Sequence, residues 1–178
     1  NQKYLLAGVG CAFREEYASI LIYDTTTFNL VKKISNFHFK GVQCIKVSPN
    51  NKYMITIGTK EEKSICIWNF KNLTVMDSKT VKFSIFDIVC ELNNDYFLYF
   101  VSVSQNVISF WRMDANMKME GFHINFEDLT KERQVNENIT GITLTPYYEQ
   151  LKTSFVLLGT NKGNIIILDK EKKIVIRK

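Results

Sequence analysis

The chain has 178 residues, 46% of them hydrophobic, which suits one ordinary globular domain. Its longest apolar runs, such as residues 165–168, are strand-sized and fall far short of the roughly 20 residues that a membrane-spanning helix needs. The net charge of +5 comes mostly from lysines scattered through loops, and the four arginines form no platform with aromatic residues, which argues against nucleic acid as a partner.

Short strands are predicted along the whole chain from alternating hydrophobicity and from turn residues at the strand ends. No segment shows helical periodicity with caps. The strands fall into one group of three and three groups of four, within residues 4–34, 42–78, 85–123 and 139–177. The predicted strands are residues 4–9, 19–24 and 30–34; 42–47, 53–57, 64–70 and 74–78; 85–91, 97–103, 107–113 and 117–123; 139–145, 154–158, 164–169 and 173–177.

One unit recurs in these groups: an apolar strand that ends in a large apolar residue and a polar one. The polar residues are Asp24, Asn69, Arg112 and Asp169, and they are 45, 43 and 57 positions apart. A period in the forties, filled with short strands, is typical of a β-propeller. The strands are also apolar on both faces, as expected for sheets that are each covered by two neighbours. We therefore predict an all-β fold, a β-propeller segment of about four antiparallel four-stranded blades with an incomplete first blade.

The first group lacks a leading strand, and the chain begins at Asn1 rather than at a methionine. We expect the chain to be a piece of a longer protein, since an array of repeats with uncovered ends is prone to aggregate. The prediction is a larger propeller of seven or eight blades, with the missing blades in the rest of the polypeptide.

The second group carries three short motifs along its length: Phe37-His38 before the first strand, Ser48-Pro49 at its end, and Trp68-Asn69 at the end of the third strand. With these motifs the group resembles a WD repeat along its whole length. Phe37-His38 stands where that family has Gly-His, and Trp68-Asn69 stands where it has Trp-Asp. The other groups are similar to the family more loosely, through Tyr23-Asp24, Trp111-Arg112 and Leu168-Asp169.

The resemblance implies a structural role for these residues, because the family's His, strand Ser/Thr, Trp and turn Asp form one hydrogen-bonded set. His38, Thr56 and Trp68 supply three of its members. The Asp before the third strand is missing, and residues 60–63 lengthen that turn instead. We therefore expect a weaker or absent network, with each lost bond costing on the order of 1 kcal/mol.

Residues 41–45, 64–68, 108–112 and 163–169 resemble the large microtubule-associated WD-repeat proteins. These include the echinoderm microtubule-associated-protein-like family and the multi-propeller proteins of centrioles and ciliary axonemes. The resemblance implies a cytoplasmic, cytoskeletal scaffold of a cilium, axoneme or centriole, with tubulin or axonemal and centriolar proteins as partners and with lysines facing acidic tubulin. Two alternatives stay open: an adaptor that recruits substrates or cargo, as in ubiquitin-ligase receptors or vesicle coats, and an enzyme built on a propeller frame.

No catalytic, cofactor or metal site is expected, and no small-molecule substrate. The carboxylate pairs at residues 15–16, 61–62 and 127–128 fall in predicted loops, and no nearby histidine or metal-ligand pattern indicates a catalytic role for them. The four cysteines form no Cys-x-x-Cys pair and the two histidines lie near no cysteine pair, so we expect buried thiols in a reducing compartment.

Two insertions are the candidate partner-binding segments. Residues 114–138 account for the 57-residue spacing and predict either a surface loop or a docking arm. The aromatic and aliphatic anchors of such an arm would be Phe122, Ile124, Phe126 and Leu129. Residues 11–18 lengthen a hairpin and offer Phe13, Arg14 and Tyr17.

Overall fold

The computed structural model describes residues 3–10, 17–92, 98–130, 137–145 and 154–177. The chain forms two compact units, residues 1–84 and residues 85–178. Each unit contains two antiparallel sheets whose strands follow one another in chain order. None of the helices in the described ranges is long and apolar enough to cross a membrane.

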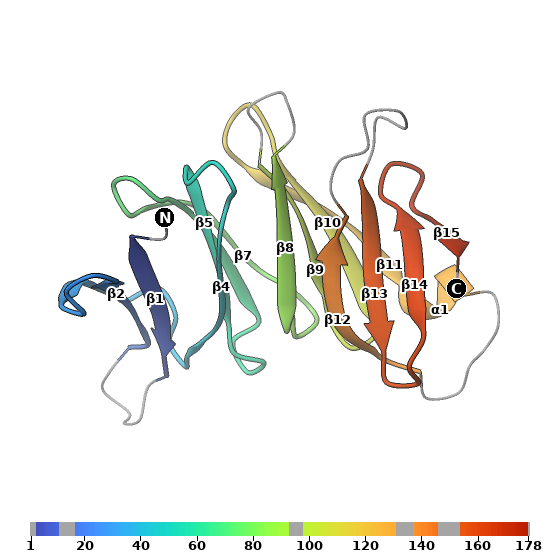
Figure 1. The fold of residues 1–178 in the computed structure, drawn as a ribbon, viewed down its shortest axis with the longest axis horizontal. Helices are drawn as coiled ribbons and strands as arrows, with labels where there is room; N and C mark the ends of the chain where they lie inside the picture. Colours follow the sequence, from blue (N-terminus) through green and yellow to red (C-terminus); the bar gives the residue numbers. More distant parts are fainter. Residues whose placement is uncertain (1–2, 11–16, 93–97, 131–136, 146–153, 178) are drawn as a thin grey trace. The chain divides into compact units, whose positions relative to one another are not determined.

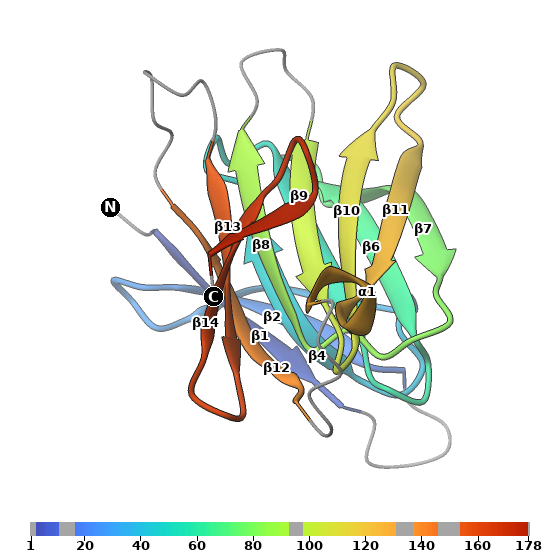
Figure 2. The same ribbon diagram turned by 90° about the vertical axis from the view of Figure 1, so that its right-hand side faces the viewer.

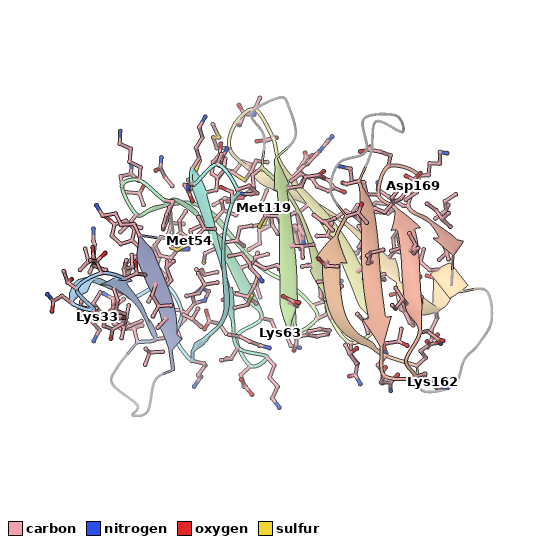
Figure 3. The ribbon with its side chains drawn as sticks, viewed as in Figure 1. Lys33, Met54, Lys63, Met119, Lys162 and Asp169 are labelled. Carbon is pink, nitrogen blue, oxygen red and sulfur yellow. The ribbon has the colours of Figure 1, made fainter. Side chains whose placement is uncertain are left out.

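The first unit pairs a three-stranded sheet with a four-stranded one (Figure 1). Its core lies between the two sheets, where Ile20 and Ile22 pack with Met54 and Trp68, all 5% exposed or less. Figure 3 shows Met54 inside this unit, whereas Lys33 lies at its surface. The strands are β1 (Tyr4–Val9), β2 (Ser19–Asp24) and β3 (Leu30–Ser35), then β4 (Val42–Val47), β5 (Tyr53–Gly58), β6 (Ser64–Asn69) and β7 (Thr74–Thr80).

The second unit holds two four-stranded sheets and one short helix, which follows β11 and contacts β11 and β15 (Figure 2). The core includes Phe110 and Phe126, together with aliphatic residues of the last sheet. The elements are β8 (Asp87–Leu92), β9 (Leu98–Val103), β10 (Val107–Met113), β11 (Met119–Asn125), α1 (Phe126–Thr130), β12 (Ile139–Leu144), β13 (Phe155–Thr160), β14 (Ile165–Asp169) and β15 (Ile174–Arg177).

All fifteen predicted strands are confirmed, with most ends within two residues. The expectation that no segment is helical is wrong for Phe126–Thr130, which forms α1. A helix of five residues is too short to show a 3.6-residue period, and Phe126 begins it as a core residue that is 3% exposed.

The turn before the last strand is the same in three of the sheets, namely β2–β3, β6–β7 and β14–β15. In each, the side chain of the last strand residue accepts hydrogen bonds from backbone N–H groups two and three positions further on, and the strand pair has a register shift at that end. The residues are Asp24, Asn69 and Asp169. At Asp24 the N–H groups of Thr27 and Thr26 hold the pKa of the carboxyl below its ordinary value. The polar residue that recurs in the sequence therefore closes a hairpin.

Each of these turns ends in a residue with positive φ: Phe28 (56°), Leu73 (58°) and Lys173 (57°). The left-handed region costs a residue with a Cβ about 1–2 kcal/mol. Because Phe28 is 79% exposed, nothing packed around its ring offsets this cost.

We expect Phe28→Gly to raise the free energy of unfolding by about 0.5–1 kcal/mol, after the entropy that glycine adds to the unfolded chain is subtracted. Urea unfolding measures the change. Val31→Gly, at a position of β3 that is 55% exposed and has no positive φ, is the control and should lower stability. A destabilised Phe28→Gly variant would contradict the argument.

The first and the last sheet of the chain each carry exposed apolar side chains. In the three-stranded sheet these include Leu5 and Val31, which are 56% and 55% exposed. In the last sheet they include Ile165, Ile174 and Ile176, at 63%, 52% and 52%. Side chains of this kind are what neighbouring sheets would cover in a larger ring, which stays a prediction.

Candidate functional site

A network of hydrogen-bonded side chains connects strands of the sheet β4–β7. His38 Nε2 lies 2.8 Å from Thr56 Oγ1, and Trp68 Nε1 donates to the same oxygen at 2.9 Å. The three side chains are at most 1% exposed. The predicted role of His38, Thr56 and Trp68 as members of one set therefore agrees with the geometry.

The fourth member of this set is Glu62, and the expectation of a weaker or absent network is wrong. Glu62 Oε1 lies 2.9 Å from His38 Nδ1 and accepts a hydrogen bond from Ser64 Oγ at 2.5 Å. Glu62 Oε2 accepts from the backbone N–H groups of Phe39 and Lys40 at 2.9 and 3.2 Å. The turn is longer than in the WD-repeat family, and glutamate has a longer side chain than the family's aspartate, so this carboxylate reaches His38. It therefore takes the place of the Asp that we expected to be missing.

Burial disfavours the charged form of Glu62, but the hydrogen bonds from Ser64, the Lys40 backbone and His38 outweigh it and hold the pKa below the ordinary value of 4.5. A lowered folded-state pKa adds stability above pH 4.5, and this stability is lost as the pH falls through the folded-state value.

We expect Glu62→Gln to cost about 1–2 kcal/mol near neutral pH and much less in acid, where wild-type Glu62 is itself protonated. Urea unfolding of both proteins over a range of pH measures this. Glu61→Gln, at an adjacent side chain that is 55% exposed, should have little effect. A loss that is equally large at acid and neutral pH would contradict the assignment.

The sheet β8–β11 contains a related arrangement around Trp111. Trp111 Nε1 donates to Ser102 Oγ at 2.8 Å, and its ring stacks on Phe100 with 5.8 Å between centroids. His123 Nδ1 lies 2.9 Å from Ser109 Oγ, and its ring meets Trp111 edge-on at 5.2 Å. The predicted structural role of Trp111 thus has a physical basis, and His123 belongs to this packing.

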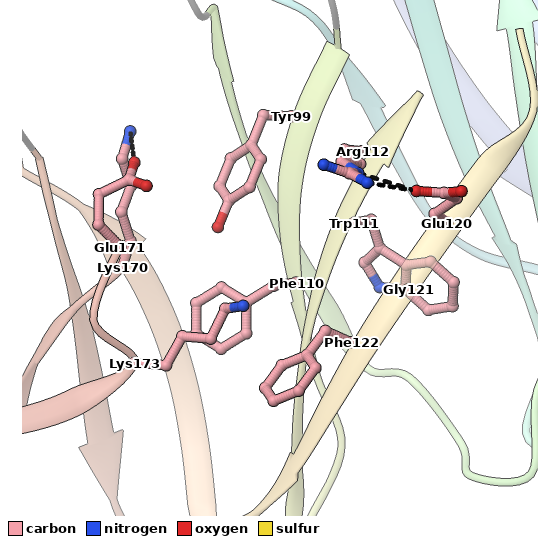
Figure 4. Close-up of a pocket in the computed structure, with 10 residues that line it drawn as sticks. All are labelled: Tyr99, Phe110, Trp111, Arg112, Glu120, Gly121, Phe122, Lys170, Glu171 and Lys173. Carbon is pink, nitrogen blue, oxygen red and sulfur yellow. Dashed lines mark hydrogen bonds and ion pairs between the residues drawn. The ribbon is translucent and has the colours of Figure 1, made fainter. Parts of the chain in front are cut away.

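A groove of about 390 Å³ opens in the second unit, between the sheet β8–β11 and the hairpin that joins β14 to β15. Aromatic side chains line it from β9, β10 and β11, and three charged residues of the hairpin complete it (Figure 4). The lining residues are Tyr99, Phe110, Trp111, Arg112, Glu120, Gly121, Phe122, Lys170, Glu171 and Lys173.

Strand register explains why four of the lining side chains share a face. Phe110 pairs with Phe122 across β10 and β11, and Arg112 pairs with Glu120 two residues along. Side chains two residues apart lie on the same face of a strand, so both pairs face the groove. Gly121 lies opposite Trp111, and a Cβ at Gly121 would come within 2.5 Å of the Trp111 ring.

Two of the three cations in the groove are paired with carboxylates. Arg112 Nη2 lies 2.8 Å from Glu120 Oε2, and Lys170 pairs with Glu91, whose other oxygen accepts from Ser154 Oγ at 2.6 Å. Burial, and then the charges of Glu171 and Glu91, raise the pKa of Tyr99, so its hydroxyl stays neutral.

Lys173 is the third cation of the groove, and it lies on aromatic rings instead of beside a carboxylate. Its Nζ is 4.0 Å from the centroid of the Phe122 ring and 6.0 Å from that of Phe110. Among the described residues, no acidic side chain forms an ion pair with it. The sequence predicts this position only as the first residue of the last strand, residues 173–177, and the observed strand β15 begins one residue later.

A search against family models finds no match to the sequence. The structure is similar to the crystal structure of the Cps50 (Swd1) β-propeller domain of Myceliophteria thermophila, with a TM-score of 0.70 and 14% sequence identity. The chain has a β-propeller fold. The match covers 98% of the chain and 51% of that domain, so the chain spans about half the length of the propeller that it matches. The predicted fold class is confirmed, and each sheet can be called a blade.

Part of the predicted docking arm, residues 114–138, belongs to a blade, and its residues 131–136 lie outside the described residues. Residues Met119–Asn125 form β11, the fourth strand of its sheet. Phe126 is buried in the core, and Ile124 and Leu129 pack against it. Only Phe122, which is 51% exposed, remains at the surface as a candidate anchor, and it lines the groove.

The second candidate segment is described only in part, since Phe13 and Arg14 lie outside the described residues. Tyr17 is 47% exposed, and its ring lies 5.4 Å from that of Phe39, which is 60% exposed. Its role in partner binding stays a prediction.

Cys66 is a packed thiol rather than a nucleophile. Burial, and then the charge of Glu62, raise its pKa to about 11, so almost none of it is thiolate at neutral pH. Cys44, Cys66 and Cys90 form no disulfide. Within the described ranges, no group of three His, Cys, Asp or Glu side chains could hold a metal ion.

Proposed function

We propose that this chain is part of a WD-repeat β-propeller that acts as a non-enzymatic scaffold for other proteins. The observation that carries the proposal is the groove beside β10 and β11. Exposed aromatic carbon from Phe122 lies there next to the ammonium group of Lys173, which forms no ion pair with a carboxylate of the described residues. Aromatic anchors among charged residues suit protein recognition. The polar networks described above around Trp68 and Trp111 each connect strands within one blade.

The WD-repeat part of the proposal is supported by the network in the blade β4–β7. The side chains of His38, Thr56 and Trp68 make the bonds that the resemblance implies, and Glu62 supplies the acidic member.

The finer proposal is that the scaffold belongs to the microtubules of a cilium, axoneme or centriole, with tubulin or a protein of these structures as its partner. It is supported by the resemblance of residues 41–45, 64–68, 108–112 and 163–169 to microtubule-associated WD-repeat proteins. The net charge of +5 would favour association with acidic tubulin.

Co-pelleting of the chain with microtubules tests the finer proposal. We expect the chain to pellet at low salt and to pellet less as salt rises, because screening weakens attraction between exposed charges. A chain that stays in the supernatant at low salt would overturn the microtubule assignment and favour an adaptor for substrates or cargo.

A further inference from the structure

We propose that the groove beside β10 and β11 binds an acidic peptide segment in which an aromatic residue stands next to a carboxylate. This inference rests on the proposed scaffold function and names the chemistry of the partner. Its site is Lys173 with the rings of Phe110 and Phe122.

The charge pattern of the groove favours binding of a ligand carboxylate at Lys173. Arg112 is paired with Glu120, and Lys170 is paired with Glu91 and, at 4.0 Å, with the groove residue Glu171. Lys173 brings a positive charge that no carboxylate of the described residues offsets by an ion pair. In Figure 4 its ammonium group lies beside Phe110 and Phe122, apart from the Arg112–Glu120 pair.

The aromatic rings beside Lys173 favour binding of an apolar group of the ligand next to its carboxylate. Phe122 is 51% exposed, whereas Phe110, its partner across the strands, is 4% exposed and anchored in the core. A cation on an aromatic face gains about 0.5–1 kcal/mol at an exposed site. The Lys173 ammonium group lies 4.0 Å from the centroid of the Phe122 ring. A ligand that contacts both the ammonium group and the ring must therefore carry a carboxylate next to an aromatic ring.

The competing ligand is a cation, such as a lysine or arginine side chain, that would displace Lys173 from the rings. Three observations favour the acidic segment. Lys173 already occupies the ring face, its charge would repel a second cation, and the whole chain is positive.

Fluorescence anisotropy with labelled hexapeptides tests the proposal on the 178-residue chain. The probe has one phenylalanine flanked by glutamates; in one control peptide serine replaces the phenylalanine, and in the other lysines replace the glutamates. We expect the probe to bind at least fivefold more tightly than either control. A lysine peptide that binds as tightly as the probe would overturn the inference in favour of a cation site.

Three variants of the chain locate the binding. Lys173→Gln and Phe122→Ser should each weaken binding of the probe at least fivefold. Lys172→Gln, one residue away and outside the groove, should change it less than twofold. If Lys172→Gln and Lys173→Gln weaken binding of the probe equally, the binding depends only on the overall charge of the chain, and the proposed site is wrong. Unchanged thermal unfolding of each variant verifies that the fold is intact.

The two proposals fail separately. If the chain co-pellets with microtubules but no probe binds, the groove inference fails and the scaffold function stands. If the probe binds as expected and the chain does not pellet, the groove stands and the microtubule assignment fails.

Discussion

Replacing Lys170 by methionine is expected to lower the free energy of unfolding by about 2–4 kcal/mol, a large share of the roughly 5–15 kcal/mol of an ordinary domain. Lys170 pairs with Glu91, and the two side chains are only 5% and 15% exposed. Methionine fills much of the same space but leaves the Glu91 carboxylate in a poorly solvated place without its cation. Urea unfolding followed by tryptophan fluorescence measures the loss.

Two further variants separate the ion pair from general effects of charge. Lys172→Met removes the same charge from the same hairpin, but Lys172 is 73% exposed and lies 3.9 Å from Asp169, so the loss should be under about 0.5 kcal/mol. Adding Glu91→Leu to Lys170→Met should restore most of the stability, since the buried charge is then gone. Similar small losses for Lys170→Met and Lys172→Met would contradict this account.

The strands could be predicted because their signal is local. In β10 four residues favour a strand, and the predicted bounds are those observed. These four residues are Val107, Ile108, Phe110 and Trp111. The hairpins could be predicted for the same reason, since Asp24, Asn69 and Asp169 each bond to the backbone a few residues away. The register shifts that accompany them carry no such signal.

Glu62 could not be assigned from its spacing. The residues around it, 60–63, are all charged and have the composition of a solvated turn. Its carboxylate reaches His38 because the turn folds over the start of β6, where Ser64 donates to it. Such a contact depends on where two distant segments meet, and a pattern along the chain does not contain that information.

The groove could not be predicted for the same reason, although Phe122 was predicted as an anchor and Trp111 and Arg112 belong to the recurring unit. Phe122 was predicted as an anchor because it is aromatic and lies in a long insertion. Its neighbour Lys173 comes from another blade and follows a turn that looks like an ordinary solvated hairpin. Only the packing of the two blades brings the ammonium group to 4.0 Å from the ring centroid. The same packing buries Phe126, which the sequence presents as an equally good anchor.

Thr56→Val is expected to lower the free energy of unfolding by about 2–4 kcal/mol, because it leaves two buried polar groups without their partner. Valine keeps the shape of threonine but cannot accept the Trp68 Nε1–H bond of 2.9 Å or meet His38 Nε2 at 2.8 Å. All three side chains are at most 1% exposed, so water cannot take over either bond. Urea unfolding measures the loss, and near-ultraviolet circular dichroism reports whether Trp68 keeps its packing.

Thr56→Ser is the matched control, since it removes a methyl group and keeps the hydroxyl. It should cost about 1 kcal/mol, the value of one buried methylene-sized group. The order of the two losses decides between polar bonding and packing as the main contribution of this residue. If serine destabilises the chain more than valine does, the blade is held together by apolar contact alone, and the set formed by His38, Thr56, Trp68 and Glu62 is a consequence of the fold rather than one of its causes.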